Sequence, residues 1–170
     1  WVGDELKAID KLEVHRKGIK HKAVSVFVMD GDRVLLQKRA ETKYHTPGLW
    51  TNTCCTHPLW GEDLGDCARR RLQEELGISG LEPVYRHNLE YRADVGGGLI
   101  EHEVVDIFLA DWHPDTNVNQ NLDEVAEVRW TPFEQLIAEV QDKQELFTPW
   151  LCIYLASHSE WIFSSGSQAG

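Results

Sequence analysis

Two glutamates, Glu101 and Glu103, lie in an apolar segment that continues through Val104, Val105 and Ile107. Residues i and i+2 of a strand point to the same face, so both carboxylates are expected on one side of a sheet. A solvated strand face is the alternative. The apolar flank favours partial burial, and two buried carboxylates at close range require a cation or a shared proton.

Three histidines, His15, His21 and His57, could complete a metal site with these carboxylates. Each alone is more typical of a surface or core histidine than of a ligand. Three imidazoles and two carboxylates suit a borderline divalent metal such as Zn²⁺ or Mn²⁺. Sequence spacing alone leaves open whether the five groups converge.

Four cysteines, Cys54, Cys55, Cys67 and Cys152, offer further chemistry. Adjacent Cys54 and Cys55 are poorly placed for a structural disulfide, and no signal-peptide pattern opens the chain. We therefore expect reduced thiols in a cytoplasmic protein. One of these thiols could act as a nucleophile, a base or a ligand.

The segment Leu64–Leu76 is predicted to be a helix, because leucine or alanine recurs every four residues along it. Asp63 is a suitable cap and Gly77 stands where helices commonly end. Arg71 and Glu75 have the spacing of a surface ion pair. Acidic residues at a helix C-terminus oppose the helix dipole, so a metal role for Glu75 is the second interpretation.

The chain of 170 residues has a net charge of −11, and no basic run typical of a nucleic-acid binder. An acidic protein that binds an anion must gather its few cations locally. Lys11, Arg39, Lys43 and Arg71 are candidates for that role. No apolar run approaches the ~20 residues that a membrane-spanning helix requires.

The elements that must position these residues are strands and helices in mixed order. Strands are expected at 23–29, 33–37, 84–91, 99–110 and 125–130, and helices at 64–76, 133–140 and from about Pro149. Pro132 is expected at a first helical position, and 41–56 is expected to be a long loop. Hairpins among the strands favour one α/β domain with a mixed sheet over a doubly wound parallel sheet.

Glu62, Arg70, Glu74, Glu75 and Gly77 resemble a degenerate Nudix box. The sequence departs from that pattern twice. Thr56 replaces the leading glycine, and Arg71 replaces the glutamate that follows the arginine. Hydrolytic members of the family use this helix to bind Mg²⁺ and activate water, so a cation at position 71 argues against diphosphate hydrolysis.

Three further motifs resemble the type 1 isopentenyl-diphosphate isomerases, a branch of this superfamily. They are the cysteine segment Trp50–Pro58, the pair formed by Tyr91-Arg92-Ala93 and Glu101-His102-Glu103, and the segment Phe147-Thr148-Pro149-Trp150. Motifs in this order run from about Lys11 to Trp150. The resemblance implies a Nudix-like α/β/α sandwich, one domain over residues 1–170, and interconversion of isopentenyl and dimethylallyl diphosphate.

The resemblance also implies roles for individual residues. Cys55 and Glu103 would be the acid–base pair on opposite sides of the substrate, Tyr91 would orient Glu103, and Trp150 would cover a carbocation-like intermediate. Lys11, Arg39, Lys43 and Arg71 match positions that contact the diphosphate.

Two metal sites are implied in the same way. One tightly bound Mn²⁺, Zn²⁺ or Mg²⁺ would be held by residues that match the family's ligands, although the spacing from His15 to His21 is one residue shorter here. These are His15, His21, His57, Glu101 and Glu103. Glu75 would hold Mg²⁺ on the substrate diphosphate.

Two other functions compete with an isomerase. A Nudix pyrophosphohydrolase would share the fold, but it should keep all the glutamates of the box. A non-catalytic zinc domain would use the histidines and cysteines, but structural zinc sites usually show closely spaced ligand pairs with a gap between them. Cys54-Cys55 has no such gap.

Overall fold

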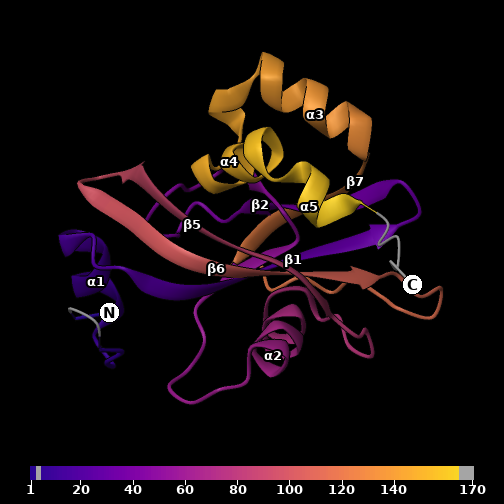
Figure 1. Ribbon diagram of the computed structural model, residues 1–170. Helices are drawn as coiled ribbons and strands as arrows, with labels where there is room; N and C mark the ends of the chain where they lie inside the picture. Colours follow the sequence, from indigo (N-terminus) through magenta and orange to yellow (C-terminus); the bar gives the residue numbers. More distant parts are fainter. Residues whose placement is uncertain (3–4, 165–170) are drawn as a thin grey trace, which may run out of the picture.

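The structure, a computed structural model, describes residues 1–2 and 5–164 (Figure 1). Its strands are β1 (His21–Asp30), β2 (Arg33–Arg39), β3 (Trp50–Thr51), β4 (Cys54–Thr56), β5 (Val84–Gly96), β6 (Leu99–Asp111) and β7 (Val125–Pro132). Its helices are α1 (Lys11–Lys17), α2 (Leu64–Leu76), α3 (Phe133–Asp142), α4 (Pro149–Ser157) and α5 (Ser159–Phe163), with a 3-10 turn at Gln144–Leu146.

The described strands form one mixed sheet. Its main path runs β3-β2-β1-β6-β5, while β4 pairs with β1 and β7 pairs with β2. Strands β1 and β6 are parallel neighbours, and the other pairs are antiparallel. The sheet is therefore mixed, as predicted. The central position of β1 explains its continuous apolar run, since both of its faces are buried.

Helices cover both faces of the sheet. Figure 1 shows α2 below the sheet and α3, α4 and α5 above it. Side chains alternate along β1: Val24 and Val26 pack in the cluster that contains Leu72 of α2, whereas Phe27 packs with Tyr154 of α4. The layers are α/β/α, which confirms the expected fold class.

Helix α2 has the predicted bounds, Leu64–Leu76. The Asp63 side chain accepts hydrogen bonds from the Gly65 and Asp66 amides, which supplies the predicted cap. Gly77 ends the helix with φ 64°, and a Cβ at this position would lie 2.7 Å from the Asn119 carbonyl oxygen. Both the left-handed backbone and the close approach therefore require glycine.

Several elements differ from the prediction. The expected loop 41–56 contains β3 and β4, which are short strands held by partners distant in sequence, β2 and β1. Helix α1 was not predicted; the Asp10 side chain caps its start and Gly18 ends it. Pro132 is the N-cap of α3 and not its first helical residue. Strand β5 continues to Gly96 because its pairing with β6 extends to the turn.

Candidate active site and metal centre

Strand register places the predicted residues side by side. His21 of β1 is paired with Glu103 of β6, and Tyr91 of β5 is paired with the same glutamate from its other side. Strand β4 places Cys55 opposite Ser25 of β1. Residues far apart in the sequence thus meet at one end of the sheet.

The side chains of His15, His21, His57 and Glu103 form what we call the metal group. Each contributes one ligand atom, and these atoms all lie within 4.8 Å of one another. His15 comes from α1 and is fully buried. The shorter spacing between His15 and His21 therefore does not prevent its side chain from reaching the metal group.

Hydrogen bonds fix the tautomer of two of these imidazole rings, those of His15 and His21. His15 Nδ1 lies 2.7 Å from the Lys11 carbonyl oxygen, and His21 Nδ1 lies 2.7 Å from the Ile19 carbonyl oxygen. Both Nδ1 atoms must carry the proton, since a carbonyl only accepts. The lone pairs are therefore on the Nε2 atoms, as in metal-ligating histidines held by backbone carbonyls.

The remaining contacts of the metal group suit a divalent cation. His57 Nε2 lies 3.0 Å from Glu103 Oε1 and 3.2 Å from His21 Nε2. Burial lowers the pKa of His57, and it lowers the pKa of His15 to about 4, so these imidazoles are neutral near pH 7. Neutral imidazole nitrogens gathered around a carboxylate are a donor set for Zn²⁺ or Mn²⁺.

Glu101 lies beside the metal group and not within it. Its carboxylate groups with His15 and His45. The Tyr91 hydroxyl lies 2.8 Å from Glu101 Oε2 and 2.8 Å from Glu103 Oε2, so it bridges the two carboxyls. Both glutamates point to the same buried side of β6, at 3% and 5% exposure, which excludes the solvated strand face.

The two glutamates have opposite pKa shifts. Burial and the nearby Glu103 charge raise the pKa of Glu101 well above its ordinary value. Burial would also raise the pKa of Glu103, but its close contacts with the rings of His21 and His57 outweigh burial and lower it. Such a pair holds a shared proton or is balanced by a cation.

The two adjacent cysteines face opposite sides of β4. Cys54 is fully buried in the cluster under α2, whereas Cys55 faces the site. Cys55 Sγ lies 3.0 Å from Asn52 Oδ1 and 3.0 Å from Ser25 Oγ, which in turn contacts Tyr154. Burial raises the pKa of the Cys55 thiol to about 12, so this group is protonated at neutral pH.

A small cavity of about 40 Å³, the inner cavity, joins these groups. Cys55, Tyr91, Glu103 and Trp150 line it, together with Tyr44 and His45. The Trp150 indole donates a hydrogen bond of 2.8 Å to Thr51 Oγ1, which fixes the ring. The inner cavity therefore combines an acid, a carboxylate and an aromatic ring.

The four predicted cations surround the mouth of this space. Lys11, Arg39, Lys43 and Arg71 all line the inner cavity. Lys11, Lys43 and Arg71 also line a larger cavity of about 800 Å³, the entrance cavity, which opens beside the metal group. Burial and the neighbouring cations lower the pKa of Lys11. Mutually repelling cations in an acidic protein indicate an anion-binding pocket.

Arg71 and Glu75 form the ion pair that their spacing predicts. Glu75 is buried, and its second oxygen accepts a 3.0 Å hydrogen bond from Gln37. Arg71 also contacts Glu74 at 2.7 Å and lies 3.9 Å from Glu124. A carboxylate in this position fits Mg²⁺ only if a ligand gives Arg71 another partner.

Two other residues of the Nudix box, Glu62 and Arg70, hold the loop before α2 in place. Arg70 Nε and Nη2 donate to the two oxygens of Glu62 at 2.7 and 2.9 Å. Glu62 also accepts from the Leu59 amide at 2.8 Å. These bonds fasten the loop before α2 to the helix.

Several residues that support the site do not stand out in the sequence. Asn52 lies within the cysteine segment and could have been singled out. Ser25, His45, Glu124 and Tyr154 lie outside the expected motif residues, and only the fold brings them to Cys55, Glu101 and Lys43.

Residues 19–151 match the model of the NUDIX domain family. Two solved structures share this fold: a MutT NUDIX hydrolase from Burkholderia pseudomallei (TM-score 0.61, 21% identity, 81% of this chain and 96% of that one) and a MutT protein from Methanosarcina mazei (TM-score 0.63, 16% identity, 81% and 91%). None of the described helices is long and apolar enough to cross a membrane.

Curated relatives are much more similar in sequence. An isopentenyl-diphosphate Delta-isomerase from Dinoroseobacter shibae is 59% identical over 97% of this chain and 94% of its own length. Proteins of the same name from Cereibacter sphaeroides and Jannaschia sp. are 60% and 55% identical, over 96% and 99% of this chain and 92% and 96% of their own lengths. The chain therefore belongs to the isopentenyl-diphosphate Delta-isomerase family, within the NUDIX superfamily.

Proposed function

We propose that this chain, acting as one domain in the cytoplasm, interconverts isopentenyl and dimethylallyl diphosphate. The observation that carries the proposal is the inner cavity, in which the Cys55 thiol and the Glu103 carboxylate meet beside the Trp150 ring. The reaction needs one group that protonates the alkene and one that removes a proton from a neighbouring carbon. Both requirements are met by residues that face the same space.

We assign Cys55 and Glu103 as the acid–base pair on opposite sides of the substrate. The protonated thiol, held by Asn52 and Ser25, is a neutral donor that tolerates an apolar site. Tyr91 positions Glu103 through its 2.8 Å hydrogen bond. The reaction is reversible, so its direction decides which group first donates and which first accepts a proton.

Trp150 stabilises the carbocation-like intermediate. An indole face attracts a cation electrostatically, and more strongly where water is excluded. The indole is 2% exposed and is fixed through Thr51. Exclusion of water matters equally, because water would trap the intermediate as an alcohol.

The metal group, with Glu101 beside it, is proposed to hold one tightly bound divalent ion. A bound ion would supply positive charge that tunes the proton affinity of Glu103. The lone pairs of the Nε2 atoms of His15 and His21 suit this role. His57 supplies the third imidazole.

Lys11, Arg39, Lys43 and Arg71 are proposed to bind the substrate diphosphate. Buried N–H groups of two of them, Arg39 Nε and Arg71 Nε, have no hydrogen-bond partner within the described residues. We propose that diphosphate gives Arg71 a new partner and so frees Glu75 for Mg²⁺. Mg²⁺ commonly binds through one or two carboxylates and substrate phosphates.

Product identification tests this function. Metal-loaded protein is incubated with isopentenyl diphosphate and Mg²⁺, and the products are separated and assayed for dimethylallyl diphosphate and for inorganic phosphate. We expect dimethylallyl diphosphate with little phosphate release. Rapid release of inorganic phosphate or diphosphate without the allylic product would instead establish a hydrolase.

A further inference from the structure

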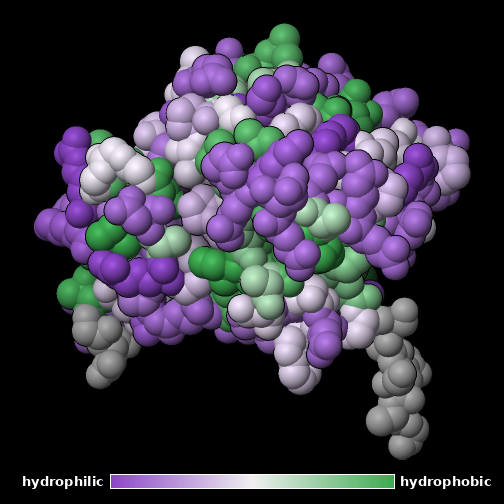
Figure 2. All heavy atoms as spheres, turned by 90° about the horizontal axis from the view of Figure 1, so that it is seen from above, coloured by the Kyte–Doolittle hydropathy of each residue, from purple (hydrophilic) through white to green (hydrophobic). Residues whose placement is uncertain are grey.

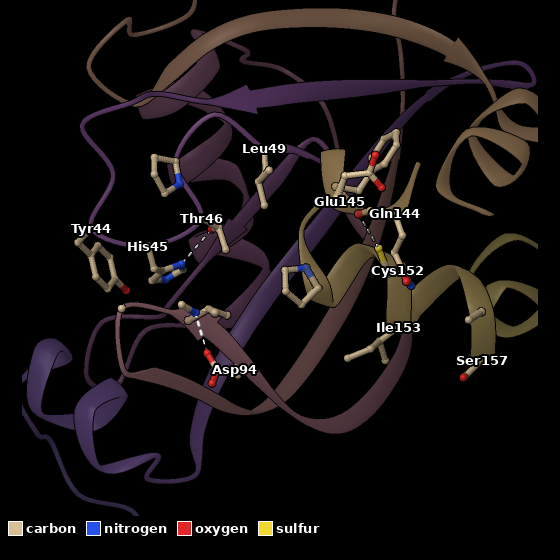
Figure 3. Close-up of a pocket in the computed structure, with 17 residues that line it drawn as sticks. Tyr44, His45, Thr46, Leu49, Asp94, Gln144, Glu145, Cys152, Ile153 and Ser157 are labelled. Carbon is tan, nitrogen blue, oxygen red and sulfur yellow. Dashed lines mark hydrogen bonds between the residues drawn. The ribbon is translucent and has the colours of Figure 1, made fainter. Parts of the chain in front are cut away.

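A further cavity, the outer cavity, takes no part in the function proposed above. This outer cavity has a volume of about 1090 Å³ (Figure 3). Its lining includes Leu49, Phe147, Pro149 and Ile153, but among the described residues that line it there is no lysine or arginine. Its apolar side chains suit hydrocarbon, and the carboxylates of Asp94 and Glu145, which also line it, repel a diphosphate.

The three cavities are adjacent in the order entrance, inner and outer, because neighbouring cavities share lining residues. The inner cavity shares Lys11, Lys43 and Arg71 with the entrance cavity, and it shares Tyr44 and His45 with the outer cavity. A substrate whose diphosphate is held at the entrance thus extends its hydrocarbon through the inner cavity towards the outer one. Of the described residues, only Tyr44 and His45 line both the inner and the outer cavity, and we call this pair the partition.

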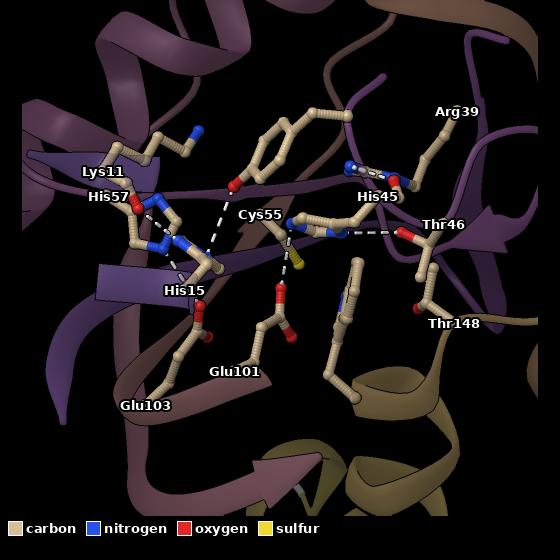
Figure 4. A network of polar contacts seen from close by, with 12 residues as sticks. Lys11, His15, Arg39, His45, Thr46, Cys55, His57, Glu101, Glu103 and Thr148 are labelled. Carbon is tan, nitrogen blue, oxygen red and sulfur yellow. Dashed lines mark hydrogen bonds and ion pairs between the residues drawn. The ribbon is translucent and has the colours of Figure 1, made fainter. Parts of the chain in front are cut away.

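His45 is the buried part of this partition. Tyr44 is 40% exposed, whereas His45 is 6% exposed. The His45 ring stands perpendicular to the Trp150 ring with centroids 5.9 Å apart, and its Nε2 lies 3.4 Å from Glu101 Oε1. The imidazole therefore fills the position beside the aromatic wall of the inner cavity (Figure 4).

Two hydrogen bonds hold His45 in place, one to its ring and one to its backbone. Its Nδ1 lies 3.0 Å from Thr46 Oγ1, and Arg39 donates a 3.1 Å hydrogen bond to its carbonyl oxygen. Thr46 has φ 47°, and no other non-glycine residue of the described chain has a positive φ. A β-branched residue in this region is strained, so the surrounding structure must hold the turn firmly.

We propose that His45 is a specificity-determining residue that sets the length of hydrocarbon the site accepts. This inference rests on the isomerase function proposed above. A five-carbon chain ends at the imidazole, and a longer branch would collide with it. Without the imidazole, the inner cavity of about 40 Å³ joins the outer cavity of about 1090 Å³.

The test compares two homoallylic diphosphates, isopentenyl diphosphate and an analogue whose methyl branch is replaced by propyl. The readout is the ratio of kcat/KM for the analogue to kcat/KM for isopentenyl diphosphate. A pocket that rejects one extra methylene discriminates by about 10- to 200-fold. We therefore expect His45→Ala to raise the ratio at least about tenfold over the unsubstituted protein.

Two further variants show whether the effect comes from opening the partition. Ile153→Ala enlarges the outer cavity and leaves His45 in place, so the ratio should stay unchanged. Ile153→Phe added to His45→Ala refills the outer cavity and should reverse the gain. A ratio that does not move in His45→Ala, or that moves equally in Ile153→Ala, would overturn the proposal.

Because His45 contacts Glu101, metal content and circular dichroism are measured on every variant. If His45→Ala loses metal or fold, His45→Asn decides, since it keeps a polar side chain but is shorter than imidazole. Its ratio should rise in the same direction, and an unchanged ratio contradicts the proposal. Failure of the isomerase function itself would be separate, since the unsubstituted protein would then not convert isopentenyl diphosphate.

Discussion

The Nε2 atoms of His21 and His57 lie 3.2 Å apart. His21 Nδ1 is already bonded to the Ile19 carbonyl oxygen, so its Nε2 presents a lone pair towards His57. This contact therefore requires either a proton on His57 Nε2 or a cation between the two nitrogens. Glu103, 3.0 Å from His57 Nε2, adds a negative charge to the same point and favours a cation.

Replacement of His57 by alanine should strip the tight metal from the purified protein. The substitution removes one of the three imidazoles of the metal group and leaves the strand register intact. Elemental analysis after dialysis measures the result. His102→Ala is the matched control, because His102 lies on β6 between the two glutamates but contacts Glu90 on the exposed side. Retention of one equivalent of metal in His57→Ala would refute the assignment.

Glu75→Gln should leave the tight metal in place and weaken binding of the substrate diphosphate with Mg²⁺. Glu75 contacts Arg71 and Gln37 and does not belong to the metal group. Titration with isopentenyl diphosphate, with and without Mg²⁺, measures the effect. The variant should lose most of the Mg²⁺-dependent gain in affinity. The two-site assignment is wrong if this variant loses the tight metal.

Cys55→Ala should nearly abolish turnover, with a loss of about 10²–10⁴-fold expected for removal of a positioned proton donor. Cys54→Ala should keep most activity, because its side chain points into the core under α2. Its cost should appear in stability instead, at about 1–2 kcal/mol for a small buried deletion. Steady-state kinetics and urea unfolding separate these effects. Equal loss of activity in both folded variants would contradict the assignment.

The Cys55 thiol should resist alkylation over an unusually wide pH range. Burial raises its pKa from 9.0 to about 12, and only the thiolate reacts with iodoacetamide. Since the acid form persists as pH rises, the rate should keep increasing beyond about pH 10, without the plateau expected for a thiol of pKa about 8.5. Peptide mapping by mass spectrometry isolates Cys55, and the urea-unfolded chain is the control. A plateau by about pH 10 in the folded protein would show an unshifted thiol.

The local parts of the fold were predictable from local signals. Helix α2 was predicted to the residue, since Asp63 and Gly77 mark its ends and its apolar stripe has the helical period. The shared orientation of Glu101 and Glu103 followed from the alternation of a strand. Helix α1 was missed because only seven residues form it and it depends on packing beside β6.

Long-range relationships were beyond the sequence. The bridge from Glu101 to Glu103 through the Tyr91 hydroxyl depends on the pairing of β5 with β6. The place of His45 depends on the turn at Thr46 and on its approach to Trp150, a residue more than a hundred positions later. Such contacts arise from strand register and helix packing, which no local pattern encodes.

The measurement that tests the central claim most directly is isotope incorporation from solvent. Metal-loaded protein is mixed with isopentenyl diphosphate in D₂O, and the product of the first turnovers is analysed by NMR. If Cys55 and Glu103 act as a protonation–deprotonation pair, dimethylallyl diphosphate should carry one solvent deuterium in its newly formed methyl group. Allylic product without deuterium, or inorganic phosphate in place of the allylic product, would contradict the account.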